Sequence, residues 1–187
     1  MKSQSKNDLL DMLEGKVEAH ISETVKIFQN LPEAELCRPS DTNGWSIAQC
    51  LEHLNSYSHY YLPHLRAVME KPRGENGPPV FTSGWLGSYF TRLMDPNQGK
   101  RKMKAFNAHI PSADLDAYAV VAEFILHQEE MLQLIRAARK ADLNTRIPIS
   151  ISKWIRLKAG DVLQFVIAHD ERHILQAKRN LPPSLKS

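Results

Sequence analysis

The sequence lacks the features by which secreted and membrane proteins are usually recognised. Its only cysteines, Cys37 and Cys50, are too few for a disulfide framework and do not have C-x-x-C spacing. Segment 1–8 is polar, without the apolar stretch of a signal peptide, and no run approaches the roughly 18 apolar residues that a membrane span needs. We therefore expect a cytoplasmic protein that does not enter a membrane.

A large excess of charge of one sign is also absent. The 24 Lys and Arg residues exceed the 21 Asp and Glu residues by only 3 among 187 residues. One local basic cluster, 100–104, has no interleaved aromatic residues, so it does not indicate nucleic-acid binding. Since 42% of the residues are hydrophobic, we expect residues 1–187 to form a single globular domain with its own core.

Four segments carry apolar residues at helical spacing and predict long helices, at about 9–30, 46–71, 112–141 and 158–179. The second has a capping box, Ser46 with Gln49, after Trp45, which can pack onto Cys50. Segment 32–44 is predicted to be a loop. The alternating stretch 146–154, around Pro148, is predicted to be an extended linker because no partner strand is evident.

Two histidines lie in the apolar stripe of the last helix. His169 and His173 are four residues apart, so their side chains stand one above the other on one face. Each needs a polar partner in a dry environment. One metal ion would satisfy both, and the alternative is two core histidines that each bond a carbonyl or a water. The run 169–173 also resembles a degenerate H-E-x-x-H protease helix, but Asp170 replaces the glutamate and no downstream third ligand follows. Any third ligand must therefore come from upstream.

The other histidines give weaker signals. His53 lies at the edge of the second helix's apolar stripe and by itself indicates a boundary histidine. His59, His64 and His127 are interpreted as ordinary packing or surface residues, as are Tyr57 and Tyr60. As general bases, Glu52, Glu129 and Asp170 are considered, but each is typical of a surface charge and none is assigned.

Two motifs together resemble the DinB-like, damage-inducible metalloprotein family: Trp45-Ser46 followed by His53, and His169, His173 and then Gln176. The resemblance implies an all-α fold, a four-helix bundle in up-down-down-up order. The long segment 72–111, with a short helix around 85–94, would be the crossover between helices two and three. It also implies that His53, His169 and His173 are the metal ligands.

Three neutral imidazoles leave coordination positions open, as in catalytic sites, and favour Zn²⁺ or Ni²⁺. The family resemblance implies a metal-dependent transferase or hydrolase acting on a small molecule, such as a low-molecular-weight thiol. The alternative is a non-catalytic, stress-associated metal-binding or interaction bundle. A homodimer is also expected, because the last helix carries a second apolar line, at 163, 167 and 174.

Overall fold

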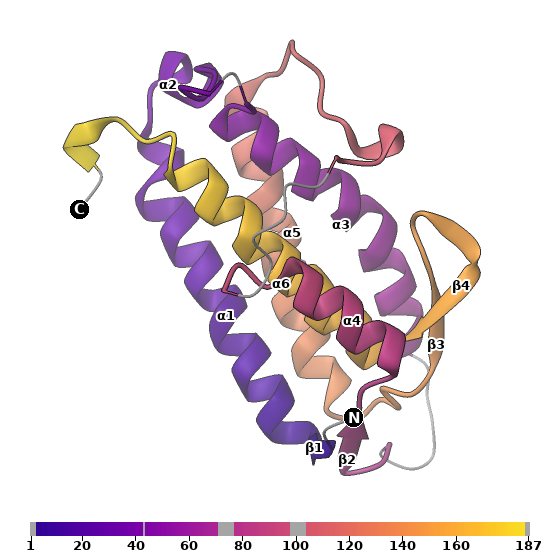
Figure 1. Ribbon diagram of the computed structural model, residues 1–187. Coiled ribbons are helices and arrows are strands. Elements are labelled where there is room, and N and C mark those ends of the chain that lie inside the picture. The colour runs from indigo at the N-terminus through magenta and orange to yellow at the C-terminus, as the bar shows by residue number, and fades with distance from the viewer. Residues whose placement is uncertain (1–2, 43, 71–76, 98–103, 186–187) are drawn as a thin grey trace.

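The computed structural model describes residues 3–42, 44–70, 77–97 and 104–185 (Figure 1). The chain is mostly helical, with four long helices, two shorter α-helices and two small sheets in these ranges. The α-helices are α1 (Lys6–Lys26), α2 (Glu33–Cys37), α3 (Ile47–Met69), α4 (Trp85–Met94), α5 (Ala117–Ala138) and α6 (Ala159–Lys178). Single 3₁₀ turns are η1 (Phe28–Asn30), η2 (Asn107–His109) and η3 (Pro183–Leu185).

Helices α5 and α6 each pack against both α1 and α3, and the core fills the space between them. Leu163, Ile167 and Ile174 are all buried in this core. The apolar line that led us to expect a homodimer is therefore covered by the chain itself. Among the described residues, no helix is long and apolar enough to cross a bilayer.

The all-α prediction was incomplete, because the chain also forms two short antiparallel pairs. Strand β1 (Ser3–Ser5) pairs with β2 (Val80–Thr82), and β3 (Arg146–Ile149) pairs with β4 (Ser152–Lys158). The second pair is a hairpin beside the bundle (Figure 1). The linker predicted at 146–154 was wrong because its partner strand follows directly, and a register shift after Pro148 accommodates the irregular pairing.

Helix boundaries differ from the predictions at three places. The first α-helix ends at Lys26 and a 3₁₀ turn continues to Asn30, while the predicted loop contains α2. Helix α5 begins only at Ala117, because Asp116 caps it by accepting from the Ala119 amide. The short helix expected around 85–94 is confirmed as α4. The predicted end of the second helix at 71 and most of the basic cluster 100–104 lie outside the described residues.

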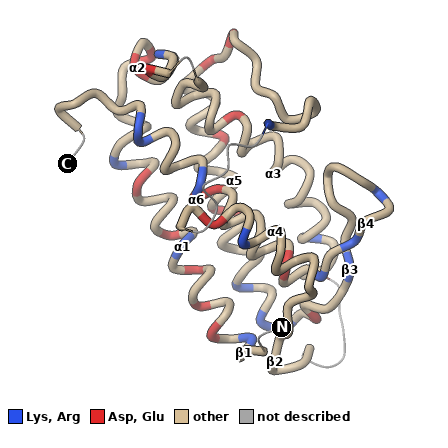
Figure 2. Tube along the Cα trace, viewed as in Figure 1, with Lys and Arg blue, Asp and Glu red and all other residues tan. Residues whose placement is uncertain are grey.

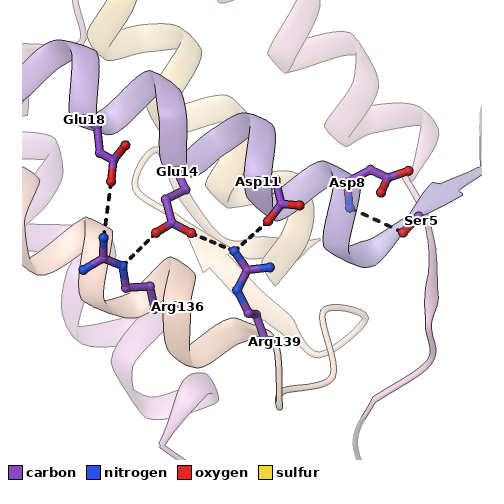
Figure 3. Close-up of polar contacts among 7 residues, drawn as sticks. All are labelled: Ser5, Asp8, Asp11, Glu14, Glu18, Arg136 and Arg139. Carbon is purple, nitrogen blue, oxygen red and sulfur yellow. Dashed lines mark hydrogen bonds and ion pairs between the residues drawn. The ribbon is translucent and has the colours of Figure 1, made fainter.

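Acidic and basic residues are interspersed along the helices (Figure 2). Arg136 of α5 and Arg139, which follows the end of α5, hold α1 through a network of ion pairs (Figure 3). Arg136 contacts Glu14 at 2.7 Å and Glu18 at 3.3 Å, and Arg139 contacts Asp11 and Glu14, each at 2.7 Å. The two arginines lower the pKa of the shared Glu14 carboxylate. Such partly exposed pairs align the two helices more than they stabilise them.

The contact between α4 and α6 gives a stability prediction. An added Cβ at Gly87 would lie 2.2 Å from Cγ of Asp161, a buried residue whose carboxylate accepts a hydrogen bond from the Gly84 amide. We expect Gly87→Ala to destabilise the fold by about 1–3 kcal/mol, as overpacking does. Urea unfolding would measure this. Gly15→Ala in α1 is the matched control, since nothing lies within 4 Å of its added Cβ; equal stability of the two variants would refute the prediction.

Candidate metal centre

Helix α6 holds His169 and His173 on the face predicted from their spacing. Their ring centroids are 4.7 Å apart. His169 is 3% exposed, whereas His173 is only half-buried. The pair therefore has one member in the core and one toward the surface.

Helix α3 brings His53 to the same place. The predicted capping box is present: Ser46 Oγ accepts from the Gln49 amide, and Gln49 Oε1 accepts from the Ser46 amide. This cap fixes the start of α3 and places His53 two turns inside it. The Trp45 ring packs beside the rings of His53 and His173, with centroids 4.8 and 5.9 Å away. His53 is therefore not at the edge of the core but buried, at 3% exposure.

The three imidazoles converge. Nε2 of His53 lies 3.2 Å from Nε2 of His169, and one nitrogen from each of the three histidines lies within 4.8 Å of the others. Two nitrogens bound tetrahedrally at Zn–N distances of 2.0–2.1 Å would be roughly 3.3 Å apart. The observed spacing of the His53 and His169 nitrogens thus matches that of two ligands of one ion.

The backbone of η2 orients His53. Its Nδ1 lies 2.6 Å from the carbonyl oxygen of His109. A carbonyl only accepts, so Nδ1 carries the proton and Nε2 presents a lone pair toward His169. Metal-binding histidines are held in this way by partners behind them. Sequence reasoning missed the role of His109, because a backbone carbonyl contributed from 56 residues away leaves no sequence pattern.

Burial keeps these histidines neutral. It lowers the pKa of His53 to about 4 and that of His173 to about 3. It also lowers the pKa of His169 well below its usual value, and the neighbouring His173 and His53 lower it further. Neutral imidazole is the form that binds metal, so the set is ready to bind at neutral pH.

Two buried nitrogens in this set lack a partner within the described residues, Nδ1 of His169 and Nδ1 of His173. An unpartnered buried polar atom is costly, but an ion at the facing Nε2 atoms of His53 and His169 would not partner Nδ1 of His169. A divalent ion bound by the three histidines would explain why three imidazoles face one another here. The donor set and its spacing fit a metal ion.

An apolar cavity of about 80 Å³ lies close to the triad. Tyr57 and Phe165 line the cavity and also contact His169, at ring-centroid distances of 4.5 and 5.9 Å. Leu93 of α4 and Ile149 of β3 form parts of its wall. Tyr57 is therefore buried at the site.

None of the three acids considered as a general base is seen to contact the triad. Asp170 is fully buried and accepts a hydrogen bond from Gln128 at 2.9 Å. Glu129 is exposed on α5. Burial and the charge of Glu123 raise the pKa of Glu52, which places Glu52 near α5 rather than among the three imidazoles. Spacing along one helix cannot show which face meets a site built by another helix.

Comparison with known proteins identifies the fold family. A model of the DinB superfamily matches residues 16–177. The solved structure of YfiT from Bacillus subtilis, described as a probable metal-dependent hydrolase with an unusual four-helix bundle topology, matches with a TM-score of 0.54. The match has 12% identity and covers 94% of this chain and 85% of that chain, and it shows a shared fold. No curated protein matches the sequence significantly. Because the family model spans most of the chain, the three histidines included, this protein belongs to the DinB superfamily.

Proposed function

We propose that His53, His169 and His173 bind a divalent metal ion and that the protein is a metal-dependent enzyme of the transferase or hydrolase type. The observation that carries this proposal is the 3.2 Å approach of the His53 and His169 nitrogens, with His53 held in the required tautomer. Zn²⁺ and Ni²⁺ are the proposed ions, because imidazole suits both. The description of YfiT as a probable metal-dependent hydrolase supports the proposal of a metal-dependent enzyme.

The chain's own residues define what the site would accept. Three imidazoles leave coordination positions open, and a bound ion would supply Lewis acidity to a substrate oxygen or sulfur. Tyr57 and Phe165 offer apolar walls beside His169. The half-buried His173 is the ligand nearest to solvent. We therefore propose a small substrate with an apolar part, such as an electrophile, together with a low-molecular-weight thiol or water as the nucleophile.

Activity should depend on the cavity as well as on the metal. We expect Zn²⁺- or Ni²⁺-loaded protein to turn over a member of a panel of aryl esters, or of aryl halides with a small thiol. Leu93→Trp should lower kcat/KM at least tenfold by filling the cavity, while the metal content stays unchanged. Leu175→Trp, at a partly exposed position on α6 away from the cavity lining, is the control. A rate that Leu93→Trp leaves unchanged would contradict a substrate site in this cavity.

A non-catalytic metal-binding bundle is the second candidate. The observation in its favour is the 3% exposure of both His53 and His169, which places two of the three ligands out of reach of solvent. Stoichiometric metal binding without turnover of any substrate in the panel would support this alternative.

The helix order, assembly and location are also proposals. The course of the ribbon in Figure 1 supports an up-down-down-up order, with α4 lying on the crossover between α3 and α5.

A homodimer in the cytoplasm is proposed, and the exposed Trp85 and Trp154 offer apolar surface for an interface. Sedimentation equilibrium at tens of micromolar would test the dimer; a monomer alone would refute it.

A further inference from the structure

A second cluster of metal-ligating side chains lies on another face of α3. His59 of α3 meets Glu123 and His127 of α5, and one ligand atom from each of the three lies within 4.8 Å of the others. Nε2 of His59 is 2.9 Å from Oε1 of Glu123, and the two imidazole centroids are 4.9 Å apart. Six residues separate His59 from His53, which turns it about 120° around the helix axis. The cluster is therefore distinct from the three-histidine site.

A buried amide fixes the tautomer of His127. Asn55 has no exposed surface, and its Nδ2 donates to the Val120 carbonyl at 3.1 Å. Its Oδ1 therefore faces Nδ1 of His127, also at 3.1 Å. An amide oxygen only accepts, so Nδ1 of His127 carries the proton and Nε2 keeps its lone pair. A metal-binding imidazole is oriented by a partner behind it in this way, just as His109 orients His53.

Carboxylates surround the two imidazoles. The charge of Glu123 adds to the effect of burial in raising the pKa of Glu52, while His59 lowers it. Glu123 and Glu130 act on His127 from its own helix, where their charges partly offset the lowering of its pKa by burial and by His59. Glu130 is paired with Arg66. Glu123 is the carboxylate that completes a ligand set with the two imidazoles, since its Oε1 lies 2.9 Å from Nε2 of His59.

A simple surface ion pair between His59 and Glu123 explains less. The two side chains are 58% and 40% exposed, and such a pair is worth little in water. It does not account for Asn55, a fully buried amide that accepts from Nδ1 of His127 and so leaves Nε2 of His127 available to bind a metal ion. Nor does it account for the third ligand atom, which lies within 4.8 Å of the other two.

We propose that His59, Glu123 and His127 form a second site for a divalent cation of the Zn²⁺ or Ni²⁺ type, with water completing the coordination. Two imidazoles and one glutamate are an established zinc ligand set. An ion there joins α3 to α5, whereas the three-histidine site joins α3 to α6. Because its ligands are more exposed, His59 most of all, it binds Zn²⁺ at least tenfold more weakly than the buried site. This site does not depend on the proposed enzymatic activity.

Zn²⁺ titration of the metal-stripped full-length protein against a chromophoric chelator tests this proposal. Two Zn²⁺ ions should bind per chain, and Glu123→Gln and His127→Ala should each weaken only the second, at least tenfold. His53→Ala should weaken only the first. His64→Ala is the matched control, since this α3 histidine bonds its own helix through the Tyr60 carbonyl. One ion per chain in the parent, or a second ion insensitive to both variants, would overturn the site.

The tautomer offers an independent measurement in case a variant misfolds. Long-range ¹H–¹⁵N spectra of the metal-free parent should show His127 protonated at Nδ1. Zn²⁺ added beyond one equivalent should then shift its Nε2 resonance. A proton on Nε2 in the metal-free protein, or no shift at any Zn²⁺ concentration up to millimolar, would exclude His127 as a ligand.

Discussion

Removing the divalent ion with a chelator should lower the melting temperature of the protein by roughly 8–16 °C. The proposed ion would join His53 of α3 to His169 and His173 of α6. Because His53 lies more than a hundred residues before the other two ligands, the unfolded chain would bind the ion far less well. Metal present at a thousand times its dissociation constant stabilises the native state by about 4 kcal/mol. In a chain of this size each kcal/mol corresponds to roughly 2–4 °C.

The ligand variants test the same site one residue at a time. His53→Ala, His169→Ala and His173→Ala should each weaken tight binding of Zn²⁺ or Ni²⁺ and reduce the melting shift that the metal produces. His64→Ala should change neither, and His127→Ala should leave tight binding intact. A His53→Ala protein that competes with a chromophoric chelator as strongly as the parent would disprove the three-histidine site.

Acidification from pH 6.5 to about 4 should progressively destabilise the metal-free protein. Burial lowers the pKa of His20 and of His53 to about 4, and that of His173 to about 3. In this pH range the unfolded chain binds protons at these histidines and the native state does not. The free energy of unfolding therefore decreases as the pH is lowered. For one such group, the 2.5-unit difference is worth up to about 3 kcal/mol.

Buried acids have the opposite effect on the pH dependence of stability. Burial raises the pKa of Asp170 to about 7, while its hydrogen bond from Gln128 lowers it in part. Between about pH 4 and 7 the native state therefore holds a proton on Asp170 that the unfolded chain releases, and this contribution is lost as pH rises. Burial also raises the pKa of Asp161. The four buried or half-buried histidines His20, His53, His169 and His173 all have a lowered pKa, so the net effect is still a loss of stability on acidification.

Urea unfolding measured at pH 7, 6, 5 and 4.5 would check this. His20→Gln is the informative variant, because His20 is buried outside the metal centre, and the substitution removes one titrating group. Its stability should fall less steeply with pH than that of the parent. A parent whose free energy of unfolding is the same at pH 7 and pH 5 would contradict the prediction.

The sequence by itself determined the local features. The 3.6-residue period placed α1, α3, α5 and α6, because an amphipathic helix carries its pattern within a few consecutive turns. Ser46 and Gln49 marked the start of α3 because a capping box is complete within four residues. His169 and His173 were recognised as a pair for the same reason, since both lie on one face of one helix.

Tertiary structure decided whatever depends on distant segments. The local pattern indicated that His53 was a boundary histidine, and only the family resemblance predicted it as a metal ligand. The local pattern could not do so because His169, which faces His53, lies 116 residues away. The His109 carbonyl and the cluster of His59, Glu123 and His127 were both missed. Each depends on which helix faces meet across the core, and the period of a single helix shows which face is buried but not what that face contacts.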